Sequence, residues 1–209
     1  YGGCSADRID EVLAPFAKLN YEKNLKMASE WIESEEKQEQ FAREKTKKDI
    51  YDAMQSLEYE INTLYSSQGQ TPFTSLGFGL GDGYFEKEIQ KAILKVRIAG
   101  LGKEKRTAIF PKLIFVIKEG LNLKPEDPNY DVKQLALECA TQRMYPDVIM
   151  YDTLVKITGS CKTPMGCRSF LPAWRDENGE LVVGVTSFAD TLEPTEQYFS
   201  WVITRYGVG

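Results

Sequence analysis

The run 109–117 constrains the fold of this chain more than any other segment. Only Pro111 and Lys112 interrupt its apolar side chains, and β-branched residues cluster toward its end. A short run that is apolar at successive positions is typical of a strand buried on both faces, as strands of parallel sheets are. Because proline cannot donate a backbone hydrogen bond, we expect an end or an edge of the sheet at Pro111.

Helices and further strands are predicted on both sides of this run. Residues 73–80 form a short apolar stretch among glycines, which favours a strand with close backbone approaches. A helix is expected next, with Ile89, Ile93 and Val96 on one face, and 147–151 is predicted to be another strand. Strands that alternate with helices indicate an α/β fold with parallel pairing.

Residues 5–66 are predicted to be helical, with Ser5 as the N-cap of the first helix. The segment 33–48 is almost entirely charged or polar, which is typical of a solvated helix face or an exposed helical hairpin. An apolar stripe at helical spacing follows, and such a stripe most often packs in a core or against another helix. The stripe consists of Ile50, Met54, Leu57, Ile61 and Leu64.

Composition narrows the class of protein. Within 209 residues, 42% are hydrophobic and 27% are charged, as in globular domains, and no apolar run is long enough for a membrane span. The net charge of −5 argues against a nucleic-acid-binding surface. Four cysteines without a disulfide-like pattern favour a reducing, cytoplasmic location. Because the chain begins at Tyr1 in the middle of a pattern, we expect an internal fragment of a longer protein.

The loop around Cys167 carries the strongest functional signal. Pro164 stiffens the approach to it, and Gly166 permits a sharp turn directly before the sulfur. Arg168 and Ser169 follow at once and suit an anionic, hydrogen-bonding ligand. A cysteine on a tight loop between anchored ends is presented to a partner molecule.

The absence of histidine limits what this cysteine can do. A hydrolytic Cys–His nucleophile is excluded, and so is a Cys/His zinc site, because no two cysteines stand within four residues of each other. A structural cysteine, a redox thiol and a sulfur radical remain. The helical periodicity around Cys139 predicts a core position, and Cys161 is interpreted as a packed residue in preference to a redox partner of Cys167.

Four ordered motifs resemble the class III anaerobic ribonucleoside-triphosphate reductases. The run 160–174, with its TPMGCRSFL core, resembles the finger loop of that family. The segments 67–79, 106–115 and 135–147 resemble three further family motifs in the same order. The resemblance covers about residues 1–180, and the order of the motifs makes it more specific than any one of them.

The resemblance implies a fold and a domain plan. The expected fold class is α/β, as part of the ten-stranded α/β barrel of the glycyl radical and ribonucleotide reductase type, preceded by a helical region. Residues 1–66 would be that helical region, on the dimer and allosteric side. Residues 67–180 would be the part of the barrel that carries the finger loop. Residues 181–209 are an unassigned tail that departs from the family pattern.

The resemblance also implies radical chemistry at Cys167. The family uses a sulfur radical on the finger loop to remove hydrogen from the 3′-carbon of the ribose. Arg168 and Ser169 are candidates for orienting the loop or the substrate, although a structural salt bridge suits Arg168 equally. Thr71 is a candidate for binding a phosphate or the ribose, with a strand-capping role as the simpler alternative. No metal ligand is predicted in this chain.

Cofactors and partners follow from the same resemblance. The family stores its radical on a glycine, which we expect outside the recognisable part of this chain, and a separate iron–sulfur S-adenosylmethionine activase installs it. Formate is the expected reductant. ATP and deoxynucleotides are the expected effectors, and a zinc site belongs to a further C-terminal part. A cytoplasmic homodimer is expected, without membrane or nucleic-acid binding.

Two other functions compete with this interpretation. Another glycyl radical enzyme, of the lyase or acyltransferase type, would share the barrel and the radical cysteine. A helical interaction module without catalytic activity would require the helices of residues 5–66 to dominate the structure. Four zinc-ligating cysteines in the downstream sequence would favour the reductase over the lyase.

Overall fold

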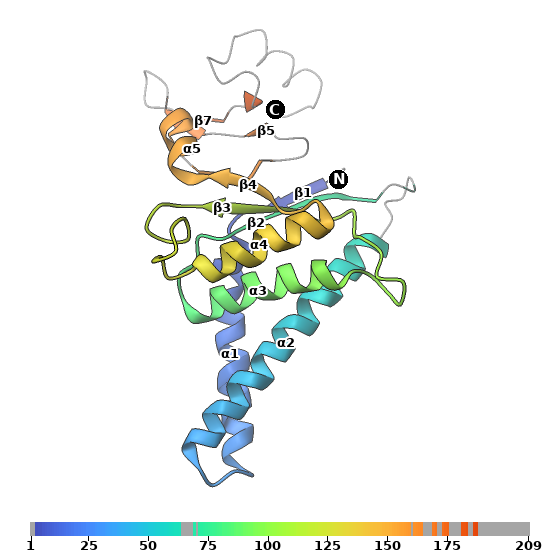
Figure 1. Ribbon diagram of the computed structural model, residues 1–209, viewed down its shortest axis with the longest axis vertical. Helices are drawn as coiled ribbons and strands as arrows, with labels where there is room; N and C mark the ends of the chain where they lie inside the picture. Colours follow the sequence, from blue (N-terminus) through green and yellow to red (C-terminus); the bar gives the residue numbers. More distant parts are fainter. Residues whose placement is uncertain are drawn as a thin grey trace.

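A parallel sheet and a long helical hairpin form the structure (Figure 1). The computed structural model describes residues 3–63, 69, 71–159 and 161–164, together with four short strands between 169 and 187. The first nine elements are β1 Gly3–Ala6, α1 Ile9–Ser29, α2 Glu35–Thr63, β2 Phe73–Phe78, α3 Tyr84–Ala99, β3 Lys112–Ile117, α4 Tyr130–Arg143, β4 Asp147–Met150 and α5 Tyr151–Thr158. The short strands are β5 Ser169–Phe170, β6 Ala173–Arg175, β7 Leu181–Val183 and β8 Thr186–Ser187.

The first four strands form one sheet in the order β1-β2-β3-β4, and every pairing is parallel. This arrangement confirms a strand within each of the predicted runs 73–80 and 109–117 and their place in one sheet, although residues 109–111 precede the strand and Ile109 is exposed. Strand β3 begins at Lys112, directly after Pro111, so the proline marks the end of the strand as its missing N–H predicts. The predicted strand at 147–151 is confirmed as β4.

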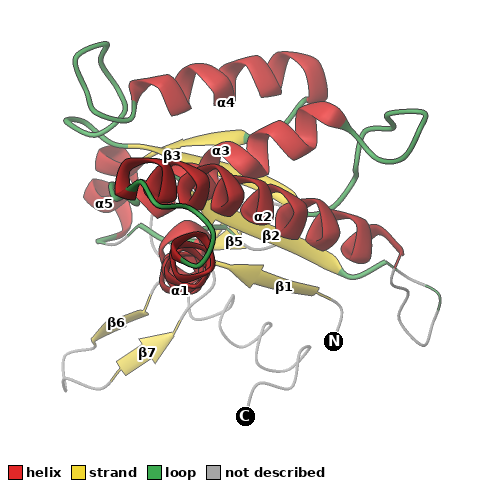
Figure 2. Ribbon diagram, turned by 90° about the horizontal axis from the view of Figure 1, so that it is seen from below, coloured by secondary structure: helices red, strands yellow, loops and turns green. Residues whose placement is uncertain are grey.

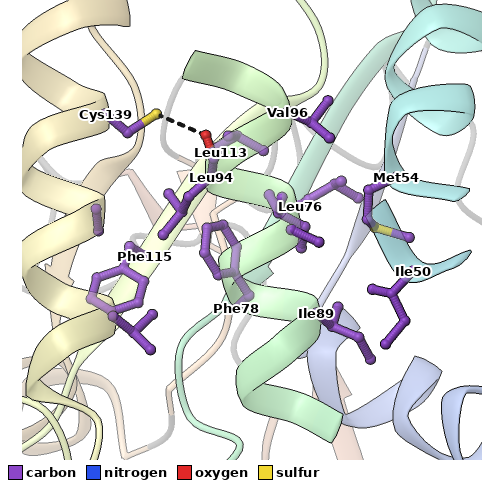
Figure 3. Close-up of a cluster of buried hydrophobic side chains, with 14 of the residues drawn as sticks. Ile50, Met54, Leu76, Phe78, Ile89, Leu94, Val96, Leu113, Phe115 and Cys139 are labelled. Atoms are coloured by element: carbon purple, nitrogen blue, oxygen red, sulfur yellow. Dashed lines mark hydrogen bonds between the residues drawn. The ribbon is translucent and has the colours of Figure 1, made fainter. Parts of the chain in front are cut away.

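The main core lies between one face of this sheet and the helices (Figures 1 and 3). Alternate residues of β2 and β3 point into it, with Phe78 and Phe115 in edge-on contact at a centroid distance of 5.6 Å. The predicted apolar face of α3 packs here, since Ile89, Ile93 and Val96 are all buried. Cys139 of α4 is fully buried, as its periodicity predicted, and its thiol donates to the carbonyl oxygen of Leu94 at 3.7 Å.

A buried ion pair joins α2 to α3 beside this core. Arg97 Nε lies 2.9 Å from Glu58 Oε2, and neither side chain is more than 5% exposed. Burial raises the pKa of Glu58, and the neighbouring guanidinium opposes that effect. Arg97 also donates to the carbonyl oxygen of Pro111 at 2.6 Å. The pair therefore holds α2, α3 and the start of β3 together.

The first residues of the chain correct the predicted boundary of the helical region. Residues 3–6 are strand β1, which pairs with β2 so that Ser5 lies opposite Ser75. Ser5 is therefore not an N-cap, and α1 begins at Ile9, preceded by Arg8 at a φ of 51°. A strand this short depends on its pairing with a segment about 70 residues away, which a local helical pattern does not encode.

Helices α1 and α2 form an arm that extends away from the sheet (Figure 1). Its charged segment 33–48 is mostly exposed, apart from residues such as Ala42 and Thr46 that face α1. Asn24 joins the two helices, because its side-chain amide donates to Thr46 Oγ1 at 3.1 Å and to Asp49 Oδ2 at 3.2 Å. The predicted exposed helical hairpin is thus present.

The fold class is α/β, built on a four-stranded parallel sheet with α1–α4 on one face (Figures 1 and 2). Helix α5 lies on the other face, where Leu154 packs against Ile114 and Ile149. The short strands form two antiparallel pairs, β5 with β8 and β6 with β7. The ten-stranded barrel stays a prediction. Among the helices of the described segments, none is both long and apolar enough to cross a membrane.

Candidate functional site

The carboxyl ends of the four parallel strands lie at one edge of the sheet. Asp7, Gly79, Lys118 and Tyr151 follow β1, β2, β3 and β4 at this edge. In parallel α/β sheets this is where ligands bind, because the loops that follow the strands converge there. Thr163 also approaches this edge, through contacts with Asp7 and Gly77.

Asp7 holds the chain that leads to the Cys167 loop. Its Oδ1 accepts a hydrogen bond from the backbone N–H of Thr163, with an N···O distance of 2.8 Å, and a second from the Thr163 hydroxyl. The two residues stand 156 positions apart in the sequence. Thr163 is 8% exposed, whereas Asp7 is exposed at the surface.

Gly77 of β2 provides the space that Thr163 occupies. A Cβ atom built on Gly77 would lie 1.8 Å from Thr163 Oγ1 and 2.9 Å from Thr163 Cβ. Real Cβ atoms do not approach other atoms so closely, so only glycine permits this contact. The predicted close backbone approach near residues 73–80 is therefore found at Gly77.

Cys161 anchors the same segment two residues earlier. It is half-buried and packs against a small apolar cluster on the sheet, formed by Ile114, Ile149 and Leu154. Burial raises the pKa of its thiol to about 11, and the nearby carboxylate of Asp7 adds to this effect. The thiol is thus protonated near neutral pH, which agrees with a packing role and disfavours attack as a thiolate.

The residues predicted for the site itself are only partly described. Cys167 and Arg168 lie outside the described residues. The backbone of Ser169 belongs to β5, opposite Ser187, and its side chain is outside the described atoms. Thr71 is half-buried and precedes β2, so it lies at the amino end of that strand. Six residues of strand span roughly 20 Å, which separates Thr71 from the Gly77–Thr163 contact.

A buried carboxylate stabilises the loop that follows β2. Asp10 of α1 is fully buried, and its Oδ2 accepts from the backbone N–H groups of Gly79 at 3.0 Å and Gly81 at 3.1 Å. The side-chain amide of Gln90 donates to the same oxygen at 2.6 Å. Asp10 therefore fixes the start of α1 to the loop beside the Gly77–Thr163 contact.

Neither Asp7 nor Gly77 was identified from the sequence as part of the site. The position of Asp7 directly after a parallel strand could have indicated it as a site residue. The sequence did not show this, because the residues of β1 fall in the region predicted to be helical. Among the described residues, no group of three or more histidine, cysteine, aspartate or glutamate side chains is placed to hold a metal ion.

Comparisons with known proteins agree with the order of the motifs. The sequence model of the anaerobic ribonucleoside-triphosphate reductase family matches residues 1–192. The match thus continues past residue 180, where the motifs placed its limit. Over 182 residues, the chain is 59% identical to the anaerobic ribonucleoside-triphosphate reductase of Salmonella typhimurium. The aligned region covers 87% of this chain and 25% of that protein.

Two further relatives carry the same name. Identity is 56% over 181 residues with the protein of Haemophilus influenzae, covering 87% of this chain and 25% of the relative. Identity is 51% over 185 residues with the protein of Enterobacteria phage T4, and the aligned region covers 88% of this chain and 30% of that relative. The chain spans about a quarter of the length of the curated relatives it matches. Because the family match covers most of its residues, the chain belongs to the anaerobic ribonucleoside-triphosphate reductase family.

Proposed function

We propose that the full-length protein containing this chain reduces ribonucleoside triphosphates to deoxyribonucleoside triphosphates, and that Cys167 is its radical residue. The observation that carries this proposal is the family match, which includes the TPMGCRSFL loop. The anchoring of Thr163 and Cys161 at the sheet supports it, because it fixes the segment just before that loop. An acyl- or diol-processing relative has no comparable support, since the similar proteins all carry the reductase name.

The chemistry begins with transfer of one hydrogen atom. The Cys167 sulfur radical takes the hydrogen from the 3′-carbon of the ribose, which leaves an S–H bond on the protein and a radical on that carbon. The two bonds have similar strengths, so the transfer is nearly balanced. Holding the sulfur at contact distance from the sugar then supplies much of the rate.

Reduction follows at the neighbouring 2′-carbon. The 2′-hydroxyl leaves as water after it takes up a proton, and formate supplies two electrons and one proton while it is oxidised to carbon dioxide. Cys167 then returns its hydrogen to the 3′-carbon and regains the radical. One ribonucleotide, one formate and one proton thus give one deoxyribonucleotide, one carbon dioxide and one water.

The full-length protein would combine a regulatory region with a catalytic barrel. Residues 1–66 would form the dimer and allosteric side, where ATP and deoxynucleotides bind as effectors. Residues 67–180 would form part of a ten-stranded barrel around the loop, with Arg168 and Ser169 near the reacting ribose. Thr71, at the amino end of β2, could then reach only a part of the substrate distant from the base of the loop. A separate iron–sulfur S-adenosylmethionine activase would install the glycyl radical that supplies the unpaired electron. The enzyme would be a cytoplasmic homodimer.

The test is Cys167→Ser in the full-length protein. Serine matches the shape of cysteine, but its O–H bond is too strong to be broken and reformed in place of S–H. We expect anaerobic turnover of a ribonucleoside triphosphate to disappear, while the glycyl radical signal in electron paramagnetic resonance and nucleotide binding persist. Turnover by the variant with its radical present would disprove the assignment of Cys167.

A further inference from the structure

We propose that Asp7 and Thr163 form a positioning contact that fixes the base of the Cys167 loop to the carboxyl end of β1. This inference rests on the proposed function. One carboxylate oxygen of Asp7 accepts from both the backbone N–H and the hydroxyl of Thr163. Two donors from one residue to one oxygen restrain both the backbone position and the side-chain rotamer of Thr163.

Close packing against Gly77 restrains the same side chain, because Gly77 and Asp7 both approach the Thr163 hydroxyl. Gly77 lies so close that any larger residue would overlap the Thr163 hydroxyl. Gly77 belongs to β2, an interior strand between β1 and β3, and its backbone is fixed by pairing with Ile114 of β3. Thr163 thus contacts both an interior strand and the carboxylate that follows the adjacent strand.

The restraint acts on a segment close to Cys167 in the sequence. Thr163 precedes Cys167 by four residues, and Cys161, packed on Ile114, Ile149 and Leu154, fixes the chain two residues further back. Neither Asp7 nor Thr163 is proposed to touch the substrate. They act by determining where the loop leaves the sheet, and therefore where the sulfur lies relative to the sugar.

Such a contact should affect turnover more than binding. A misplacement of about 1 Å can lower the rate of a positioned reaction about 100-fold. Removing the contact should therefore lower kcat much more than it changes the KM for the nucleotide. A merely structural contact would instead lower thermal stability and leave the kcat of each activated molecule unchanged.

The experiment uses Thr163→Val and Asp7→Ala in the full-length, activated protein. We expect kcat per glycyl radical to fall roughly 10- to 100-fold in each, with KM within about twofold of the parent value. Thr163→Ser keeps the hydroxyl and should retain most of the activity. Thr141→Val is the matched control, because it removes a threonine hydroxyl from the exposed face of α4 and should leave kcat unchanged.

A second measurement tests the position of the sulfur directly. With a substrate deuterated at the 3′-carbon, a displaced Cys167 makes hydrogen transfer slower than other steps, so the isotope effect on kcat should rise in Thr163→Val and Asp7→Ala. Asp7 is exposed, so its variant should fold even where Thr163→Val does not. Unchanged kcat and isotope effect in Asp7→Ala would overturn the inference. Turnover by Cys167→Ser would instead overturn the proposed function, so the two failures are distinguishable.

Discussion

At the scale of single residues, the burial of a cysteine decides whether its thiol can react. Cys139 is fully buried in the main core, and burial raises the pKa of its thiol from 9.0 to about 11. The folded protein therefore holds this proton more tightly than the unfolded chain does. The stability that the protonated thiol contributes is fully present below pH 9, and it is lost as the pH rises toward 11 and the thiol ionises. A thiol that is buried and protonated contributes to packing and does not react as a thiolate.

Replacing Cys139 should therefore affect stability and leave the chemistry intact. We expect Cys139→Ser to lower the free energy of unfolding by about 1–3 kcal/mol, because a more polar hydroxyl replaces a weakly polar thiol in an apolar site. Thermal unfolding of the full-length protein measures this, and activity per folded molecule should stay at the parent level. Cys4→Ser is the control, since Cys4 is exposed. Equal melting temperatures for the two variants would contradict a core role for Cys139.

At the scale of elements, the arm and the sheet should differ in local stability. The first half of α2 is charged and mostly exposed, whereas β3 is paired on both sides and buried along nearly its whole length. Backbone amides open more readily where few apolar contacts cover them. We expect residues 35–48 to exchange hydrogen for deuterium faster than residues 112–117 in the intact protein. Equally slow exchange in both segments would show that the arm is covered.

The elements also show what local sequence can and cannot predict. The strands β2 and β3 and the apolar face of α3 were predictable because each carries a pattern several residues long. Strand β1 was missed, since four residues hold too little pattern and its pairing with β2 is a long-range contact. For the same reason the loop sequence could indicate Cys167 as a candidate, while the Asp7–Thr163 contact, formed across 156 positions, required the structure.

At the scale of the whole molecule, α1 presents apolar side chains that nothing in the described structure covers. Val12, Phe16 and Leu19 are 56%, 66% and 62% exposed, and their spacing of four and three residues places them on one face of the helix. Exposed apolar side chains that gather on one helix face are typical of a protein interface. This face belongs to residues 1–66, the region proposed to form the homodimer.

Charges on this face should weaken the dimer. Burying a phenylalanine or leucine side chain contributes about 1.5–3 kcal/mol, so Phe16→Glu with Leu19→Glu removes that gain and places two carboxylates in an apolar contact. We expect sedimentation velocity of the full-length protein to show a shift from dimer toward monomer, with a matching loss of the response to effectors. Lys18→Glu changes the charge of the same helix at another exposed position and should leave the dimer intact. If the double variant sediments as the parent dimer does, the two copies meet on another surface.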